Sequence, residues 1–210
     1  MELTIDGRTV EAEPGSTVLE AIRSSGSNVP TLCYDDRQAP FGACRVCLVA
    51  AEGVPGLIPA CTTLCRDGMS IDTRDPTARR VATAVVELVL SELPEPPDPH
   101  TELAAVARDL EVGEPRWPGQ VHEPHLEADH PYLVLRHELC ISCGRCVRAC
   151  DEVQGAFALT ATGRGFHANV TAGLDSGFRN STCVSCGACA DTCPTGAITE
   201  TTLMDLALAG

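Results

Sequence analysis

The sequence predicts an α+β fold of two small cysteine-rich domains joined by a helical connector. Three observations support this prediction. Residues 1–75 alternate apolar and polar side chains in short stretches around one helical segment, which is typical of a small β-rich domain. Residues 76–131 hold helical and Pro-rich stretches, and residues 132–200 contain one cysteine motif twice. The last residues, 201–210, are predicted to form a short terminal helix.

The first strands are indicated by Asp6-Gly7, a dipeptide typical of a two-residue hairpin turn, which stands between two alternating stretches. Thr17 and Glu20 form a capping box ahead of a short apolar helix that Gly26 should end. Two further strands are expected, over residues 45–51 and 69–73. A sheet crossed by one helix, with a long loop that carries cysteines, is the layout of a β-grasp domain of the ferredoxin type.

The connector begins with a helix that Asp75 caps and in whose first turn Pro76 is favoured. Its apolar residues form one stripe that should pack against a neighbouring element: Val81, Val85, Leu88 and Val89. The helix should end before Pro94. The sequence then predicts a stiff linker, a second short helix, a loop rich in Pro, Glu and His, and a strand, in that order: 94–99, 101–110, 114–131 and 132–135.

Composition narrows the class of protein. The chain has 13 cysteines but only 3% aromatic residues. So many cysteines are typical of a secreted disulfide scaffold, of zinc sites or of iron–sulfur cluster ligation. The N-terminal stretch MELTIDGRTVEAEPG has neither the basic run nor the apolar core of a signal peptide, and no stretch approaches the roughly 18 apolar residues of a membrane span. We therefore expect a cytoplasmic protein whose thiols are metal ligands.

Charge and the lack of catalytic motifs exclude other classes. A net charge of −14 argues against a nucleic-acid partner, because a phosphate backbone requires a basic footprint. No Gly-rich phosphate loop, Ser/His/Asp arrangement or pair of carboxylates stands out in the sequence. The sequence therefore predicts no catalytic residue, and whether the chain belongs to an enzyme depends on its partners.

The strongest signal is a C-x2-C-x2-C-x3-C motif that occurs twice, which is the arrangement of two-cluster bacterial ferredoxins. Three thiolates two residues apart wrap one face of a cubane, whereas the fourth lies on a following helical turn and points at the other cluster. One [4Fe–4S] cluster is expected on Cys140, Cys143, Cys146 and Cys193. The other is expected on Cys183, Cys186, Cys189 and Cys150. Within the motifs the backbone must approach the sulfides closely at Gly144 and Gly187. A pair of zinc sites is the alternative, but zinc more often takes two separated C-x2-C pairs.

A third set of cysteines has the spacing C-x10-C-x2-C-x13-C and consists of Cys33, Cys44, Cys47 and Cys61. Plant-type ferredoxins have a shorter first gap, and the longer gap is typical of a [2Fe–2S] loop in electron-input subunits of the respiratory type. A single zinc site is again the alternative. Gly42 should let this loop fold tightly, and Cys65 is expected to be a buried spare thiol rather than a fifth ligand.

The histidines give weaker signals. His122, His125 and His130 lie in the Pro-rich stretch, where solvated loop positions are the favoured interpretation and a metal ligand is the alternative. His137 precedes Cys140 closely enough for a hydrogen bond near a cluster. The sequence assigns no role to His100.

Four segments together resemble one family: PTLCYDDRQAPFGACRVCLV, CISCGRCVRACDEVQG, GRGFHANV and CVSCGACADTCPTGAITE. The chain is similar, over nearly its whole length, to the iron–sulfur N-terminal region shared by three groups of proteins. These are the large iron–sulfur subunit of NADH dehydrogenase, the catalytic subunit of NAD-dependent formate dehydrogenase and the diaphorase subunit of NAD-reducing hydrogenase. The DEVQG after Cys150 and the GRGF segment look most like the formate dehydrogenase branch.

The sequence departs from that family in two places. The family normally holds an additional cubane on one His and three Cys, but no cysteine occurs here between Cys65 and Cys140, and His100 lacks such partners. We therefore expect this extra cluster to be absent. Formate dehydrogenase relatives also continue into a large pterin-binding domain, whereas this sequence ends at Gly210. A catalytic centre is accordingly expected on another polypeptide.

The resemblance implies an electron-transfer subunit of a multi-subunit NAD-linked oxidoreductase. Its expected partners are a flavin/NAD(H)-binding diaphorase subunit and a catalytic subunit with a molybdenum- or tungsten-pterin or a nickel–iron centre. Formate dehydrogenase is the favoured complex and NAD-reducing hydrogenase the next. A free-standing ferredoxin-like carrier is the alternative function. The terminal substrate, the direction of electron flow, the cluster potentials and the stoichiometry are left open by the sequence.

Overall fold

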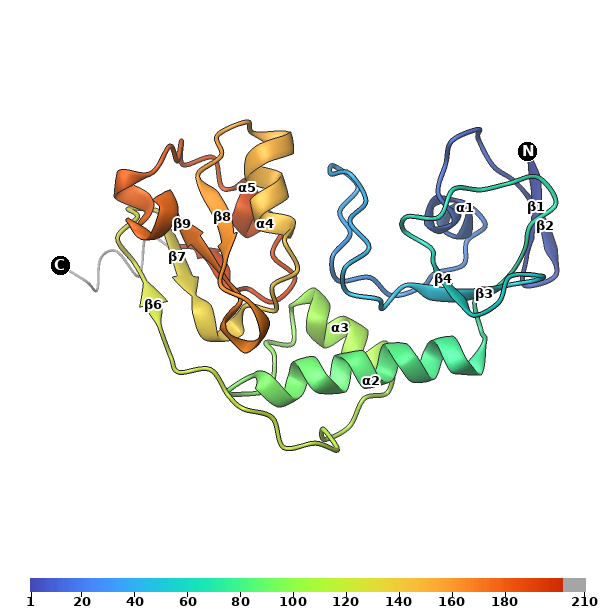
Figure 1. The fold of residues 1–210 in the computed structure, drawn as a ribbon, viewed down its shortest axis with the longest axis horizontal. Coiled ribbons are helices and arrows are strands. Elements are labelled where there is room, and N and C mark those ends of the chain that lie inside the picture. The colour runs from blue at the N-terminus through green and yellow to red at the C-terminus, as the bar shows by residue number, and fades with distance from the viewer. Residues whose placement is uncertain (202–210) are drawn as a thin grey trace. The chain divides into compact units, whose positions relative to one another are not determined.

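The computed structural model describes residues 1–201 (Figure 1). The predicted terminal helix over residues 201–210 therefore lies outside the described residues, apart from Thr201. The chain divides into two compact units. Unit 1 comprises Met1–Tyr34, Pro40–Leu88 and Val106–Trp117, and unit 2 comprises Asp35–Ala39, Val89–Ala105 and Pro118–Gly210. The predicted connector is thus divided between the units. No helix among the described residues is long and apolar enough to cross a membrane.

Unit 1 contains a five-stranded sheet in the order β2-β1-β5-β3-β4. Its strands are β1 (Glu2–Ile5), β2 (Arg8–Glu11), β3 (Leu48–Ala51), β4 (Leu57–Pro59) and β5 (Ser70–Asp72). β1 and β5 are parallel, and the other neighbours are antiparallel. The predicted hairpin is confirmed: Asp6 and Gly7 join β1 to β2 with φ of 50° and 80°. Positive φ at both turn residues is what the right-handed twist of paired strands favours in a two-residue loop.

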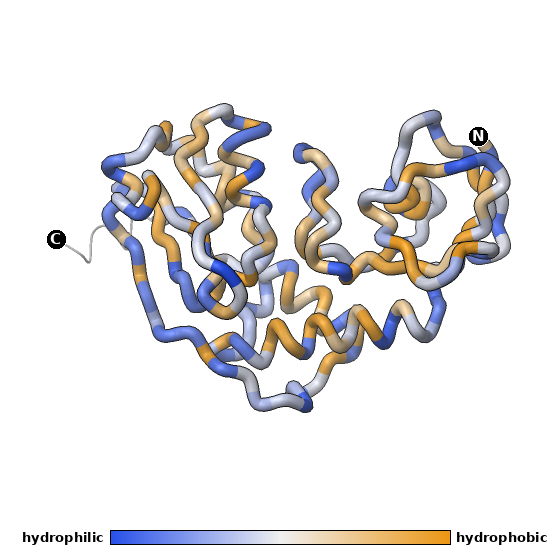
Figure 2. The backbone as a smooth tube through the Cα atoms, viewed as in Figure 1, coloured by the Kyte–Doolittle hydropathy of each residue, from blue (hydrophilic) through white to orange (hydrophobic). Residues whose placement is uncertain are grey.

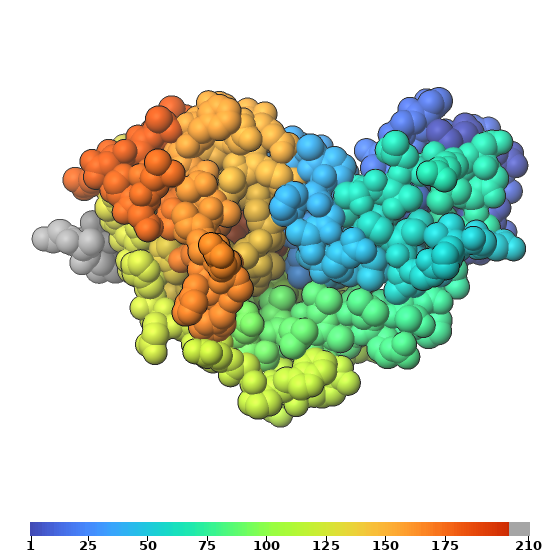
Figure 3. All heavy atoms as spheres, viewed as in Figure 1, coloured from blue at the N-terminus to red at the C-terminus, as the bar shows by residue number. Residues whose placement is uncertain are grey.

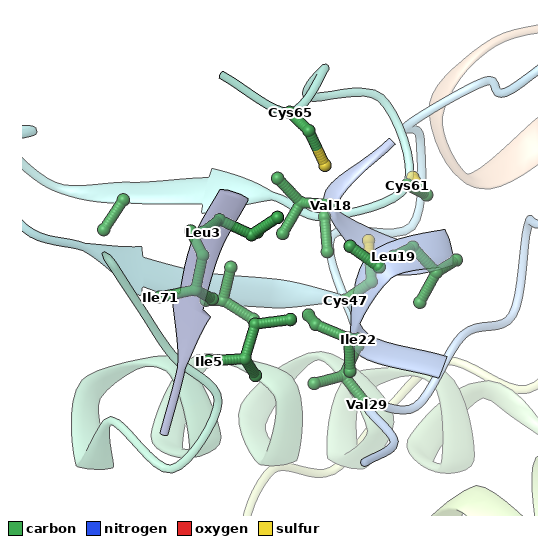
Figure 4. Close-up of a cluster of buried hydrophobic side chains, with 14 of the residues drawn as sticks. Leu3, Ile5, Val18, Leu19, Ile22, Val29, Cys47, Cys61, Cys65 and Ile71 are labelled. Atoms are coloured by element: carbon green, nitrogen blue, oxygen red, sulfur yellow. The ribbon is translucent and has the colours of Figure 1, made fainter. Parts of the chain in front are cut away.

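The predicted capping box is present at helix α1 (Val18–Ser24). The Glu20 amide donates to Thr17 Oγ1 at 3.3 Å, and the Thr17 amide donates to Glu20 Oε2 at 2.6 Å. Gly26 follows the helix with φ of 79°, in the left-handed region that favours glycine. Figure 4 shows side chains of α1, β1 and β5 pointing toward one another; the core they form includes Leu3, Ile5, Val18, Leu19, Ile22 and Ile71.

Two strands of unit 1 differ from the prediction. β3 begins at Leu48 rather than at residue 45, because the cysteine loop continues through Arg45, whose φ is 59°. β4 was not predicted from the sequence. It is a three-residue edge strand whose Pro59 pairs with Leu48, and a proline is tolerated at an edge because no further strand needs its missing N–H.

Helix α2 (Pro76–Glu92) begins as predicted, since Asp75 Oδ1 accepts the amides of Thr77 and Ala78 at 2.9 and 2.8 Å. The predicted apolar stripe is wrong. Leu88 is 51% exposed, and Val81, Val85 and Val89 are only half-buried. The row that is buried is offset around the helix: Ala78, Ala82 and Val86. The small side chains of the two alanines let α2 approach its neighbour closely. Along α2 in Figure 2 hydrophobic and hydrophilic residues alternate, as expected for a helix with only one buried face.

Unit 2 contains two sheets and several short helices. One sheet has the order β10-β7-β6 and the other pairs β8 with β9, all antiparallel. The strands are β6 (Leu126–Glu127), β7 (Leu133–Arg136), β8 (Leu159–Thr162), β9 (Asn169–Ala172) and β10 (Ile198–Glu200). The helices are α3 (Glu102–Asp109, which continues into unit 1), η1 (His137–Leu139), α4 (Arg145–Arg148), η2 (Ala149–Val153), η3 (Gly165–His167), η4 (Gly173–Asp175), η5 (Phe178–Asn180) and α5 (Ala188–Asp191).

The core of unit 2 joins apolar strand residues to cysteines. Leu133, Leu135 and Ile198 are each at most 2% exposed, and they pack in one cluster with Cys146, Cys150 and Cys189. The predicted loop over residues 114–131 is mostly exposed and lies at the surface in Figure 3, although β6 forms within it and pairs with β7. Three motif cysteines therefore belong to the hydrophobic core itself, whereas Cys186 is exposed.

Candidate metal centres

The N-terminal set of four cysteines comes together in unit 1. Cys33, Cys44 and Cys47 lie on the long loop between α1 and β3, and Cys61 follows β4. The set forms two pairs: the Cys44 amide donates to Cys33 Sγ at 3.4 Å, the thiols of Cys33 and Cys44 are hydrogen-bonded, and so are those of Cys47 and Cys61. Two pairs of thiols match the needs of two irons that each take two cysteines.

Electrostatics within this set oppose the ionisation of all four thiols. Hydrogen bonds with Cys33 and Cys61 raise the pKa of Cys44 and Cys47, and burial raises both further. The Cys47 thiol, as donor, lowers the pKa of Cys61. Four neighbouring thiols cannot all ionise in a buried site unless positive charge compensates them. Bound metal would supply that charge, since it deprotonates coordinating thiols.

The loop around this set is tight at Gly42, as predicted. Gly42 has φ of 69°, and a Cβ there would lie 3.0 Å from Cγ2 of Thr62, the neighbour of Cys61. Cys65, in contrast, is 6% exposed within the apolar core, its amide donates to the carbonyl of Ser16, and Figure 4 shows its sulfur apart from those of Cys47 and Cys61. This placement agrees with the interpretation of Cys65 as a spare thiol.

In unit 2, the first C-x2-C-x2-C-x3-C motif meets the last cysteine of the second. Cys140, Cys143, Cys146 and Cys193 influence one another electrostatically. Burial raises the pKa of Cys143 to about 12 and that of Cys146 well above its usual value. Gly144 takes the left-handed conformation (φ 72°) and turns the chain into α4, which carries Cys146. The structure thus brings together the four cysteines that the sequence assigned to one cubane.

The second group lines a small cavity. Its walls include Cys150, Cys183, Cys186 and Cys189, together with apolar side chains such as Leu133 and Phe178. Gly187, with φ of 75°, turns the chain into α5 as Gly144 does into α4. Cys150 lies on η2 and accepts the Ala158 amide at 3.1 Å, which fixes its sulfur.

A single metal ion also needs several ligand side chains close together. Within residues 1–201, no group of three or more His, Cys, Asp or Glu side chains is close enough to hold one.

Of the three histidines predicted to be solvated, His125 is exposed and His122 is half-buried, whereas His130 differs from the prediction. His130 is not a solvated loop residue: it is 7% exposed, and its Nε2 lies 3.1 Å from Ser185 Oγ and 3.7 Å from Cys183 Sγ. Desolvation lowers its pKa. His137 is also buried, but its ring nitrogens contact Asn169 and Glu127. The remaining two stack on rings, His122 on Phe166 and His125 on His137.

One buried charge network was missed in the sequence. Arg145 lies between two motif cysteines, and only 5% of its side chain is exposed. Its guanidinium contacts Glu102 through both Nη atoms, at 2.6 and 2.9 Å, and Thr192 Oγ1 and Asp35 Oδ2 at 3.0 and 3.4 Å. Arg37 also pairs with Asp35, and its hydrogen bonds hold the pKa of that carboxyl well below the usual value. The sequence signal for this network was the position of Arg145 between Cys143 and Cys146, where a charged side chain needs a partner if it is buried.

Two domain families match the chain. Residues 1–76 match the 2Fe-2S iron-sulfur cluster binding domain, and residues 139–197 match the 4Fe-4S dicluster domain. An NADH-quinone oxidoreductase subunit of Rhizobium meliloti (strain 1021) is 36% identical over 207 residues, which are 94% of this chain and 24% of that protein. NADP-reducing hydrogenase subunit HndD of Solidesulfovibrio fructosivorans is 32% identical over 95% of this chain and 36% of its own length. The chain thus spans 24% and 36% of these relatives.

A solved structure shows the same fold over nearly all of the chain. A chain in the crystal structure of an NAD⁺-reducing [NiFe]-hydrogenase in the H2-reduced state superposes with a TM-score of 0.85 and 28% identity, covering 96% of this chain and 88% of that one. The chain thus has an N-terminal 2Fe-2S cluster binding domain and a C-terminal 4Fe-4S dicluster domain, and it is similar to subunits of NADH-quinone oxidoreductases and NAD(P)-reducing hydrogenases.

Proposed function

We propose that this chain is an electron-transfer subunit with one [2Fe–2S] and two [4Fe–4S] clusters. The [2Fe–2S] ligands are Cys33, Cys44, Cys47 and Cys61. The ligands of the first cubane are Cys140, Cys143, Cys146 and Cys193, and those of the second are Cys150, Cys183, Cys186 and Cys189. The observation that supports this proposal is that thiols of the same predicted set are neighbours: they shift one another's pKa in the first two sets and line one cavity in the third.

The clusters, when bound, supply one-electron redox chemistry, and the protein supplies position and electrostatics. Backbone amides donate to ligand sulfurs: those of Cys44, Ser142 and Ser185 donate at 3.4 Å to Cys33, Cys140 and Cys183, respectively. Such bonds stabilise the negative charge of the thiolates and of a reduced cluster, and they therefore raise the reduction potential.

The relationship to oxidoreductase subunits favours a permanent subunit over a free carrier. As partners we propose a flavin/NAD(H)-binding diaphorase subunit and a separate catalytic subunit, in the cytoplasm. A catalytic subunit of the hydrogenase type is suggested by the relatives, whereas formate dehydrogenase rests only on the sequence resemblance at DEVQG and GRGF. Gel filtration of the native extract separates the two functions, because a freely migrating monomer would support the carrier instead.

Metal analysis of anaerobically purified protein tests the cluster count. We expect about 10 iron atoms and as much acid-labile sulfide per chain, whereas about 14 would indicate an additional cubane and about 2–3 zinc atoms would refute redox function.

Substitution separates the sites. Cys47→Ala should remove the [2Fe–2S] electron paramagnetic resonance (EPR) signal and about 2 iron atoms while both cubane signals persist. Cys65→Ala is the matched control, because Cys65 is a buried cysteine of the same unit outside the four-thiol set, and it should retain all the iron. Loss of the cubane signals in Cys47→Ala would contradict the division into separate sites.

A further inference from the structure

We propose that His130 donates a hydrogen bond from Nε2–H to the Cys183 thiolate and thereby raises the reduction potential of the second cubane above the value its cysteines alone would set. This inference rests on the proposed function, since it assumes a cluster on Cys183. It assigns a positioning and tuning role to a residue that no cysteine motif contains.

The His130 ring is held in the core of unit 2 beside this ligand. It precedes β7, is 7% exposed, and meets the Phe178 ring edge-on with centroids 5.3 Å apart. Its Nε2 lies 3.7 Å from Cys183 Sγ, within hydrogen-bond reach for sulfur. A ring clamped in this way loses little further entropy when it holds a donor against the thiolate.

The hydrogen bond made by Nδ1 of His130 determines that the ring proton is on Nε2. The Tyr132 amide donates to His130 Nδ1 at 3.0 Å, so Nδ1 acts as an acceptor and carries no hydrogen. The single hydrogen of the neutral imidazole must then be on Nε2. Nε2 also lies 3.1 Å from the Ser185 hydroxyl, which shares this hydrogen. Of the two possible acceptors, the Cys183 thiolate would be charged when it binds a cluster, whereas the Ser185 hydroxyl is neutral. Charge-assisted hydrogen bonds are the stronger kind, so the thiolate is favoured.

The repeated motif provides an internal comparison. Cys140 and Cys183 hold the same position in the two motifs, and each accepts the amide of the residue two positions later at 3.4 Å. Within the described residues, a histidine nitrogen lies within hydrogen-bond reach of Cys183 Sγ but not of Cys140 Sγ. Reduction adds negative charge to a cluster, so the extra donor stabilises the reduced state of the second cubane. The two cubanes should consequently differ in potential in the direction that makes the second the better electron acceptor.

Three variants of His130 test this inference in EPR-monitored redox titrations of the intact protein. His130→Leu removes the donor and should lower the midpoint potential of one cubane by about 59 mV, which is a tenfold change in the equilibrium constant of a one-electron couple. The other cubane and the [2Fe–2S] signal should keep their potentials. His130→Gln places an amide N–H near the position of Nε2 and should restore most of the shift, whereas His130→Asn reaches only as far as Nδ1 and should not.

A spectroscopic readout separates hydrogen bonding from mere packing. In protein labelled with ¹⁵N-histidine, pulsed EPR of the reduced protein should show a ¹⁵N coupling on one cubane that disappears in His130→Leu. The matched control is His137→Gln, since His137 is the other buried histidine but contacts Asn169 and Glu127; it should leave the coupling unchanged. Full iron content with unshifted potentials in all His130 variants would overturn this inference alone, whereas a chain without cubanes would overturn the proposed function.

Discussion

Replacing Arg145 by methionine should destabilise unit 2 strongly. Methionine keeps the length and much of the volume of the side chain but removes the charge and every donor. Arg145 donates to three residues of unit 2, namely Glu102, Thr192 and Asp35. Its side chain is 5% exposed, so water cannot replace these contacts at the same place.

The loss in unfolding free energy depends on which partners Asp35 and Glu102 keep when the guanidinium is removed. Asp35 is 7% exposed, but it keeps the Arg37 guanidinium at 2.9 and 3.0 Å and the Thr192 hydroxyl at 2.7 Å. Glu102 is 50% exposed and can return to water. Removing one partner of a buried pair usually costs about 3–5 kcal/mol, and the remaining partners of Asp35 place this case near the lower end, at ~3 kcal/mol.

The assay should follow cluster loss, because proteins with tightly bound cofactors do not unfold as simple two-state systems. The rate at which visible absorbance bleaches in urea under anaerobic conditions should rise by about 100-fold if the whole ~3 kcal/mol appears in the unfolding barrier. Arg164→Met, on an exposed arginine of the same unit, is the control and should change stability by less than about 0.5 kcal/mol.

A double-mutant cycle tests how much of the destabilisation comes from the interaction between Arg145 and Asp35. Asp35→Asn removes the carboxylate that Arg145 faces, so the double variant should be less destabilised than the sum of the two single variants by about 1 kcal/mol or more. The reasoning would be refuted if Arg145→Met bleached at the rate of Arg164→Met. It would also be refuted if the two single effects were additive.

Two further predictions concern Asp35 and the capping box. Because hydrogen bonds from Arg37 hold the pKa of Asp35 below its usual value, its carboxylate stabilises the fold above the unfolded-state pKa of about 3.9 and loses this effect as pH falls toward the folded-state pKa. The difference in bleaching rate between wild type and Asp35→Asn should therefore be constant above about pH 5 and shrink below about pH 4; a difference that grew on acidification would contradict this. Thr17→Ala should cost about 1 kcal/mol in thermal unfolding of unit 1, and an unchanged midpoint would show that the cap is dispensable.

Features that depend on neighbours a few residues apart could be predicted from the amino-acid sequence. The Asp6-Gly7 turn and the Thr17–Glu20 capping box form as predicted because their interactions lie within four residues. Gly144 and Gly187 likewise make the same local turn ahead of the third cysteine in both motifs.

The buried face of each element and the meeting of distant polar groups depend instead on the folded chain. Ala78, Ala82 and Val86 are buried in α2, although the bulkier valines suggested another face, because the surroundings of a helix rather than its own sequence select the side that packs. His130 meets Cys183 across 53 positions and Arg145 meets Asp35 across 110. No periodic pattern records such pairs, because burial and hydrogen bonding between remote segments exist only once the chain has folded.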